Sequence, residues 1–232
     1  MKLSLAALPF LLMSVVAHGE RDPSEVIAVV LGQEVTVADV AESPIDGLIN
    51  GLLVAKFKED NGIEATEREI AAFVDRMVES QRRALLDFEA ERAELMAALD
   101  EAVNPEQRQE IEERLALVAK RIETMSDPPR ADWGGWRTTA RPWVERWKLD
   151  KALFDRYGGR AHFQQVGVQP FDAVIRFLEE QQASGAFTIL DEDYEAAFWA
   201  YWRSDAHNFI PEEEAVELLA KPWWLMDPPS DD

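Results

Sequence analysis

Residues 66–125 read TEREIAAFVDRMVESQRRALLDFEAERAELMAALDEAVNPEQRQEIEERLALVAKRIETM, and this stretch decides the fold. It opens with Thr66-Glu67-Arg68-Glu69, the pattern of a capping box at the start of a helix. Proline ends one helix and starts another, so Asn104-Pro105 divides the stretch into two helices folded back on each other. Mostly apolar residues recur at steps of three and four in both halves, as in a packed seam between helices: Leu85, Phe88, Arg92, Leu95, Leu99, Val103, Ile111, Leu115, Val118, Ile122 and Met125.

The sequence therefore predicts a long helical hairpin over about 66–126. Each of its two helices would be ~30 Å long. The positions outside the seam are mostly Glu, Arg, Gln and Ala. Two arrangements stay open: the hairpin projects into solvent as an arm, or it packs along the body as an ordinary helix pair.

The segment before the hairpin predicts a short β-hairpin followed by helices. Val26–Val30 and Glu34–Thr36 are β-branched runs separated by a turn. Thr36-x-x-Asp39 is a second capping-box pattern. Ser43-Pro44 predicts the start of a helix that ends at Asn61-Gly62.

The segment after the hairpin is rich in tryptophan, because all eight tryptophans lie between Trp133 and Trp224. A Pro- and Gly-rich linker is predicted over 127–137. The predicted elements beyond it are a helix over 142–157, a short strand over 161–166, and helices starting at Pro170, Asp191 and Pro211. The fold class is thus mainly α, with a short N-terminal β-hairpin, the long helical hairpin and a Trp-rich helical C-terminal part.

The first residues have the pattern of a secretory signal peptide. Lys2 precedes an apolar run from Leu3 to Ala17, and small residues follow. The run is shorter than the ~20 residues that a membrane-spanning helix needs. We expect cleavage near Ala17–Gly19, a periplasmic or secreted protein, and no stable membrane insertion. The predicted division is a signal peptide (1–19), a helical module containing the hairpin (20–157), a helical C-terminal part (158–225) and a disordered acidic tail (226–232).

Composition argues against several classes of function. The net charge is −21, from 45 acidic and 24 basic residues, whereas nucleic-acid binding requires Lys and Arg to neutralise phosphates. The chain has no cysteine, which removes disulfides and thiol chemistry. His162 and His207 lack carboxylates at metal-ligand spacing, and each is expected to be an ordinary surface or core residue. We therefore expect no metal, no cofactor and no catalytic residue.

The N-terminal segment carries a family resemblance. Residues 26–40 read VIAVVLGQEVTVADV and resemble the opening of SurA-type periplasmic chaperones, with Gly32, Thr36 and Asp39 matching and Leu31 standing where Asn is usual. The segments 48–56 and 61–70 are similar to the next parts of that family. The resemblance covers roughly residues 24–80. No segment resembles the parvulin prolyl-isomerase domain that the family commonly carries.

The resemblance implies an exported, non-catalytic, chaperone-like protein that assists folding or assembly of envelope proteins. Its expected ligands are unfolded or extended polypeptides. Their apolar side chains would be buried in a groove between helices, for which the candidate wall residues are Leu48, Leu52, Phe57, Phe73 and Trp147. The competing interpretation of each of these residues is ordinary core packing.

Two alternatives stay open. In the first, the helical hairpin and the aromatic C-terminal part dock one specific protein, or a second copy in a homodimer. Trp223 and Trp224 are the tryptophans that we expect to be exposed for such a partner. In the second, the protein is an enzyme related to peptidyl-prolyl isomerases.

Overall fold

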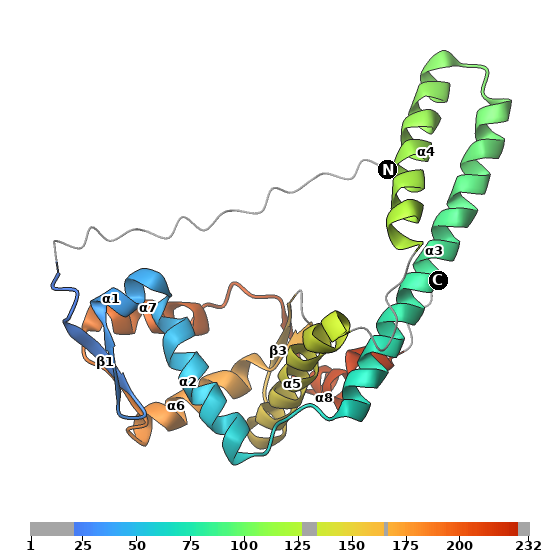
Figure 1. Cartoon of the computed structure of the whole chain (residues 1–232). Coiled ribbons are helices and arrows are strands. Elements are labelled where there is room, and N and C mark those ends of the chain that lie inside the picture. The colour runs from blue at the N-terminus through green and yellow to red at the C-terminus, as the bar shows by residue number, and fades with distance from the viewer. Residues whose placement is uncertain (1–20, 127–133, 165–166, 227–232) are drawn as a thin grey trace. The chain divides into compact units, whose positions relative to one another are not determined.

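The computed structural model describes residues 21–126, 134–164 and 167–226, and these residues are mainly helical, as predicted (Figure 1). The expected signal peptide (1–19) and nearly all of the expected acidic tail lie outside the described residues. The chain forms two compact units: unit 1 comprises Met1–Val54 and Gln181–Arg203, and unit 2 comprises Ala55–Glu180 and Ser204–Asp232. This division does not follow the predicted boundary between 157 and 158.

Strand pairing explains why unit 1 combines two segments that are far apart in the sequence. Strand β1 (Val26–Val30) pairs antiparallel with β2 (Gln33–Thr36), as the predicted hairpin requires. The other edge of β1 pairs antiparallel with β5 (Phe187–Ile189), with Ala28 opposite Ile189. The three-stranded sheet therefore joins residues 181–203 to the N-terminal segment.

The helices of unit 1 begin where the sequence signals place them. Helix α1 (Val37–Glu42) starts with the predicted capping box, in which the Thr36 N–H donates to Asp39 Oδ2 at 2.8 Å. Helix α2 (Ile45–Asp60) follows Pro44, and the boundary between the units falls within it. Helix α7 (Glu192–Trp202) is capped by Asp191, whose side chain accepts from the Tyr194 N–H at 3.2 Å.

The turn between β1 and β2 has an unusual residue. Leu31 and Gly32 form a two-residue connection with φ values of 51° and 79°. Positive φ at both positions is the backbone that matches the twist of a hairpin, and it favours Asn-Gly or Gly-Gly. Leu31 is the only described residue other than glycine with positive φ, and it adopts that backbone at the cost of steric strain.

The predicted helical hairpin is confirmed in unit 2. Helices α3 (Glu67–Glu101) and α4 (Pro105–Met125) run side by side (Figure 1), and the Asn104 side chain caps α4 by accepting from the Glu106 N–H at 2.8 Å. The fully buried residues of α3 all lie between Ile70 and Val78. Beyond them α3 packs on α4 through a seam that buries Ile111, Val118 and Ile122. The base of the hairpin thus belongs to the core of unit 2, and its distal part forms a solvated arm.

Helix α5 (Gly134–Tyr157) is longer than predicted, because Pro142 lies inside it instead of at its start. The predicted linker is therefore wrong over 134–137, and its remaining part lies outside the described residues. Tertiary contacts stabilise the added turns: Arg137 forms an ion pair with Glu67 on α3, and Ala140 is fully buried. At the other end, Gly158 and Gly159 stop the helix with positive φ, as expected.

A second small sheet completes unit 2. Strand β3 (Ala161–Gln164) pairs with β4 (Gly167–Gln169) on one side and β6 (Phe209–Ile210) on the other. Only β3 was predicted, as residues 161–166, since strands of two or three residues carry no periodic signal. The other elements are α6 (Phe171–Ala183), which continues into unit 1, α8 (Glu212–Ala220) and the 3-10 helix η1 (Trp223–Leu225).

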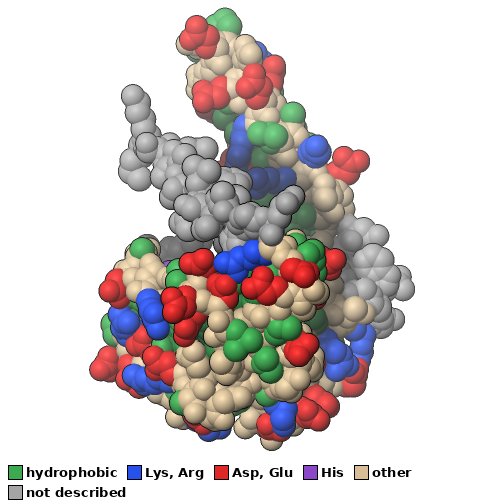
Figure 2. All heavy atoms as spheres, turned by 90° about the vertical axis from the view of Figure 1, so that its left-hand side faces the viewer, with side chains coloured by type: hydrophobic (Ala, Val, Ile, Leu, Met, Phe, Trp, Pro, Cys, Tyr) green, Lys and Arg blue, Asp and Glu red, His purple; other side chains and the backbone are tan. Residues whose placement is uncertain are grey.

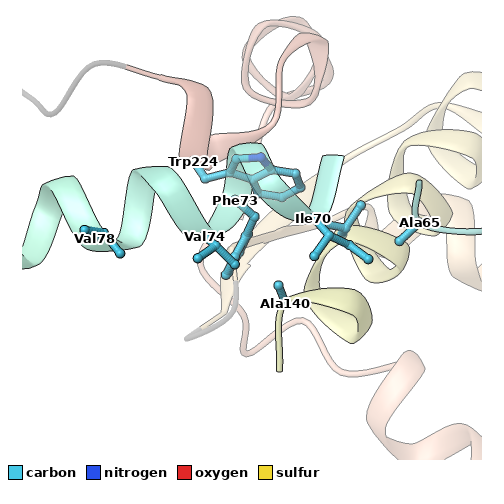
Figure 3. Close-up of a cluster of buried hydrophobic side chains, with 8 residues drawn as sticks. Ala65, Ile70, Phe73, Val74, Val78, Ala140 and Trp224 are labelled. Atoms are coloured by element: carbon cyan, nitrogen blue, oxygen red, sulfur yellow. The ribbon is translucent and has the colours of Figure 1, made fainter. Parts of the chain in front are cut away.

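One cluster of buried side chains joins α3, α5 and η1 within unit 2. Phe73 and Val74 of α3 pack with Ala140 of α5 and with Trp224 of η1 (Figure 3). The Phe73 and Trp224 rings meet edge to face, with centroids 5.2 Å apart. The start of the hairpin, α5 and the end of the described chain therefore share one core. Within residues 21–126, 134–164 and 167–226, no helix has both the length and the apolar character of a membrane span.

Candidate functional site

Unit 2 contains a pocket with a cavity volume of about 140 Å³ beside this core. Helix α5 forms one wall, because residues 143, 146, 147 and 150 follow helical spacing and therefore share a face. Residues of β3, β4, α8 and η1, together with Met226, supply the remaining walls. The complete lining is Trp143, Arg146, Trp147, Asp150, Phe163, Gly167, Val168, Leu218, Leu219, Trp223 and Met226.

Four aromatic side chains line the pocket, and the three tryptophans among them pack against other rings. The Trp143 and Trp223 rings meet edge to face with centroids 6.3 Å apart, and Trp147 packs on Trp224 in the same way at 5.8 Å. Phe163 is 63% exposed and Trp223 is 38% exposed, so these two rings form an accessible rim. The pocket is thus a pre-formed apolar depression with an aromatic entrance.

Two charged residues give the pocket its polar character. Asp150 is only 6% exposed, and Arg146 Nε donates to its Oδ2 at 2.7 Å. Burial raises the pKa of Asp150 to about 6, although the Arg146 guanidinium acts in the opposite direction. Within the described part of the chain, Asp150 Oδ1 and both Nη groups of Arg146 make no hydrogen bond. The pocket therefore offers one unused acceptor and several unused donors.

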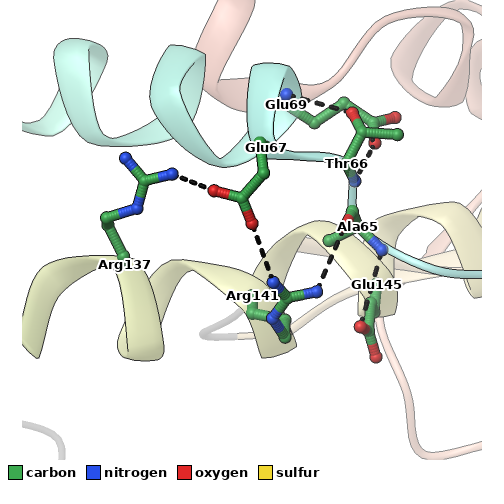
Figure 4. A network of polar contacts seen from close by, with 7 residues as sticks. All are labelled: Ala65, Thr66, Glu67, Glu69, Arg137, Arg141 and Glu145. Carbon is green, nitrogen blue, oxygen red and sulfur yellow. Dashed lines mark hydrogen bonds and ion pairs between the residues drawn. The ribbon is translucent and has the colours of Figure 1, made fainter. Parts of the chain in front are cut away.

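Ion pairs fix the pocket-bearing helix α5 to the start of α3. Glu67 forms an ion pair with Arg137 and a second one with Arg141 at 3.1 Å, while Arg141 Nη1 also donates to the Ala65 carbonyl at 3.1 Å (Figure 4). Glu145 binds the Lys58 ammonium and accepts from the Ala65 N–H. Partial burial raises the pKa of Glu145, but these two partners lower it on balance. The contacts connect the α5 wall to the base of the hairpin.

A separate polar cluster is formed by His162 of β3, Gln169 of β4 and His207. His162 is buried, and its Nε2 lies 2.6 Å from Gln169 Oε1. The ring centroids of His162 and His207 are 5.1 Å apart, a proximity that their sequence positions did not reveal. Burial lowers the pKa of His162, and the neighbouring His207 acts in the same direction. Among the described residues, no group of three or more His, Cys, Asp or Glu is arranged to hold a metal ion. His162 is a hydrogen-bonded core histidine, one of the two roles expected for it.

The five predicted groove residues are divided between the two units. Leu48 and Leu52 lie half-buried on α2 in unit 1, whereas Phe57, Phe73 and Trp147 belong to unit 2. Phe57 is buried against Phe177, with ring centroids 5.2 Å apart, and Phe73 is buried in the core cluster. Both follow the competing interpretation of core packing. Trp147 is the one predicted groove residue that lines the pocket.

Trp223 and Trp224 were both expected to be exposed, but their side chains differ in exposure. Trp224 is only 2% exposed, so its predicted exposure is wrong. The 3-10 turn directs its ring onto Phe73 and Trp147, where it fills the core of unit 2. Trp223, the adjacent residue, instead lies at the pocket rim.

Asp150, Arg146 and Phe163 are pocket residues that the sequence did not single out. The spacing Trp143-x-x-x-Trp147-x-x-Asp150 puts a carboxylate on the aromatic face of one helix, and that was a usable signal. Phe163 carries no such signal, since its position depends on the pairing of β3 with β4.

Comparison with models of known protein families, with curated proteins and with solved structures finds no match to this chain. The resemblance to SurA-type chaperones stays a prediction.

Proposed function

We propose that this chain is an exported, non-catalytic, chaperone-like protein that assists folding or assembly of envelope proteins. Its ligands are unfolded or extended polypeptides, and its pocket in unit 2 holds one client side chain at a time. The observation that carries the proposal is the aromatic pocket itself, which is pre-formed, open at its rim and about the size of a single side chain. The N-terminal resemblance supports the same class of function.

Pocket size favours a side chain over a small-molecule ligand. Small-molecule sites commonly enclose about 300–1,000 Å³, whereas this cavity measures about 140 Å³. A dry cavity of comparable volume accommodates a molecule as small as benzene. An amino-acid side chain fits this space, and the rest of a polypeptide would remain outside the rim.

The chemistry of the walls favours transient binding of many sequences. Tryptophan rings provide a large contact area with little loss of conformational freedom, which is why they are frequent at binding hot spots. The net charge of −21 disfavours self-association and attracts basic segments. On the face shown in Figure 2, acidic and basic side chains lie interspersed with small groups of apolar ones. The protein thus combines a small apolar site with a strongly charged exterior.

An aggregation assay tests the proposal. Residues 20–232 are added to chemically unfolded citrate synthase diluted into buffer, and light scattering is followed. We expect a concentration-dependent delay. Phe163→Ala should weaken it several-fold, because it removes the exposed aromatic rim. Leu117→Ala is the matched control, since Leu117 is similarly exposed but lies on the hairpin arm.

Two results count against the proposal. One is the absence of any delay at a tenfold excess of the folded protein. The other is an equal loss in the Phe163→Ala and Leu117→Ala variants, which would separate client binding from the pocket.

A specific docking role is the second candidate, and the arm supports it. Apolar side chains are exposed along α3 and α4 and in the turn between them: Leu86, Met96, Val103 and Leu117. Capture of one stoichiometric partner from periplasmic extract, lost when these residues are changed to Ser, would favour docking. Capture of many partners in low amounts favours the chaperone-like function.

A further inference from the structure

Resting on this proposed function, we infer that the pocket selects a basic side chain, with lysine as its best occupant. The aliphatic part of lysine would lie along the tryptophan rings, and its ammonium would reach Asp150 Oδ1. Two features of the pocket lead to this assignment: an under-compensated buried carboxylate, and walls made of aromatic faces and edges.

The carboxylate of Asp150 lacks a second partner. Its Oδ2 accepts from Arg146 Nε at 2.7 Å, but its Oδ1 makes no hydrogen bond within the described residues. Burying an ionised carboxylate is costly unless charge partners and hydrogen bonds compensate it fully. The pKa of Asp150 remains raised despite Arg146, so the guanidinium stabilises the ionised carboxylate by less than burial destabilises it. A cationic donor at Oδ1 supplies the missing compensation.

The aromatic walls suit the rest of a lysine side chain. Trp143, Trp147 and Trp223 line the cavity, and Phe163 stands at its rim. Long basic side chains bury their methylene groups on apolar surfaces while their charged end meets a polar group. Cations are also attracted to the faces of Trp and Phe rings. The same walls would hold a neutral aliphatic side chain, so Asp150 is the group that makes the difference.

Arg146 does not block this occupant. Its side chain is 39% exposed, and its Nη groups make no hydrogen bond in the described part of the chain. A long, half-exposed guanidinium remains largely solvated, and water screens its repulsion of a second cation. An acidic side chain would find these Nη donors, but it would enter next to Asp150 on a protein with net charge −21. The charge balance therefore favours a basic occupant.

Capped Gly/Ser peptides with a single variable central residue test the assignment. The residue is lysine, N-acetyl-lysine, norleucine or glutamate. Binding to residues 20–232 is measured at about 150 mM salt by the change in tryptophan fluorescence, in millimolar titrations. We expect the lysine peptide to bind at least tenfold more tightly than the norleucine and acetyl-lysine peptides. Asp150→Asn should remove this preference.

Asp155→Asn is the matched control. It removes one carboxylate from the exposed side of the same helix, outside the pocket, and should keep the lysine preference. Norleucine binding as tightly as lysine, or glutamate binding most tightly, would overturn the basic-side-chain assignment and leave the proposed function standing. If no peptide binds and client aggregation is not delayed, both fail. If Asp150→Asn does not fold, the comparison of lysine with acetyl-lysine on the unmodified protein decides.

Discussion

The two units each gather aromatic side chains, but only one of the two clusters leaves accessible space. In unit 1, Phe198 lies between Phe187 and Trp199, with ring centroids 5.5 and 5.1 Å away, and all three rings are buried. In unit 2, Trp143 and Trp223 meet at 6.3 Å and line a cavity of about 140 Å³. Similar residues thus form a closed core in one unit and an open pocket in the other.

The surrounding elements cause this difference. The rings of unit 1 are covered by a three-stranded sheet with α7 packed on β5. The pocket of unit 2 is bounded by α5, α8 and the short elements β3, β4 and η1, and within the described residues these provide walls without a cover. A buried carboxylate on α5 adds a polar group to that pocket. Aromatic content alone therefore does not distinguish packing from binding; the distinction depends on what covers the rings.

The largest expected effect is the loss of stability when the closed cluster is opened. Phe198→Ala removes a fully buried ring and should lower the free energy of unfolding by about 3–5 kcal/mol. Phe163→Ala removes a ring that is 63% exposed and should cost less than about 1 kcal/mol. Urea denaturation of both variants measures the two values.

Peptide binding should be affected more by Phe163→Ala than by Phe198→Ala, which is the reverse of their effects on stability. Phe163→Ala weakens it, whereas Phe198→Ala preserves it under conditions where the protein is folded. If Phe163→Ala proved as destabilising as Phe198→Ala, its ring would be part of a core and the contrast between the clusters would fail.

Asp150 gives the open cluster a pH dependence. Its folded-state pKa of about 6 lies above the ordinary value of 3.8, so the folded protein binds this proton more tightly than the unfolded chain. The contribution to stability is therefore present below about pH 4 and is lost as pH rises through 6, by roughly 3 kcal/mol in total. The wild type should lose stability relative to Asp150→Asn over this range. Urea midpoints at pH 4, 5, 6 and 7 measure the difference.

Subtracting the Asp150→Asn curve removes the effects of other carboxylates. Burial raises the pKa of Asp172, but the hydrogen bonds and charge of Arg160 lower it on balance, so its stabilisation is lost as pH falls. That change occurs in both proteins and cancels. A flat difference from pH 4 to 7 would show that Asp150 is not buried as a charge in the folded state.

Elements with local signals could be predicted from the sequence. Capping boxes at Thr36 and Thr66 and the break at Asn104-Pro105 place helix ends correctly, because each depends on residues within one turn. The start of α5 could not be placed, since its first turns are stabilised by Glu67, about 70 residues away in the chain. The pairing of β5 with β1 could not be predicted either, because it joins segments that are far apart in the sequence.

The pocket was only partly predictable for the same reason. Trp147 and Asp150 share a helix face, so their proximity follows from spacing alone. Phe163 and Trp223 reach the pocket through β3 and η1, and neither position follows from local sequence. Trp223 and Trp224 show most clearly what local sequence cannot predict. Trp223 lines the pocket, whereas Trp224, the next residue of the same 3-10 turn, is buried in the core.

A further predicted effect concerns the turn that closes the sheet of unit 1. Leu31 has a φ of 51°, a conformation that strains a leucine and that asparagine tolerates far better. Leu31 is 38% exposed, so the change loses little buried apolar surface. Leu31→Asn should therefore raise the free energy of unfolding by about 1 kcal/mol.

Differential scanning calorimetry measures this increase in stability. The control is Leu190→Asn, which changes another exposed leucine of unit 1 outside the turn. A lower melting temperature for Leu31→Asn would mean that packing of the Leu31 side chain stabilises unit 1 by more than the strained backbone destabilises it. The close packing seen around Phe198 would then reach as far as the β1–β2 turn.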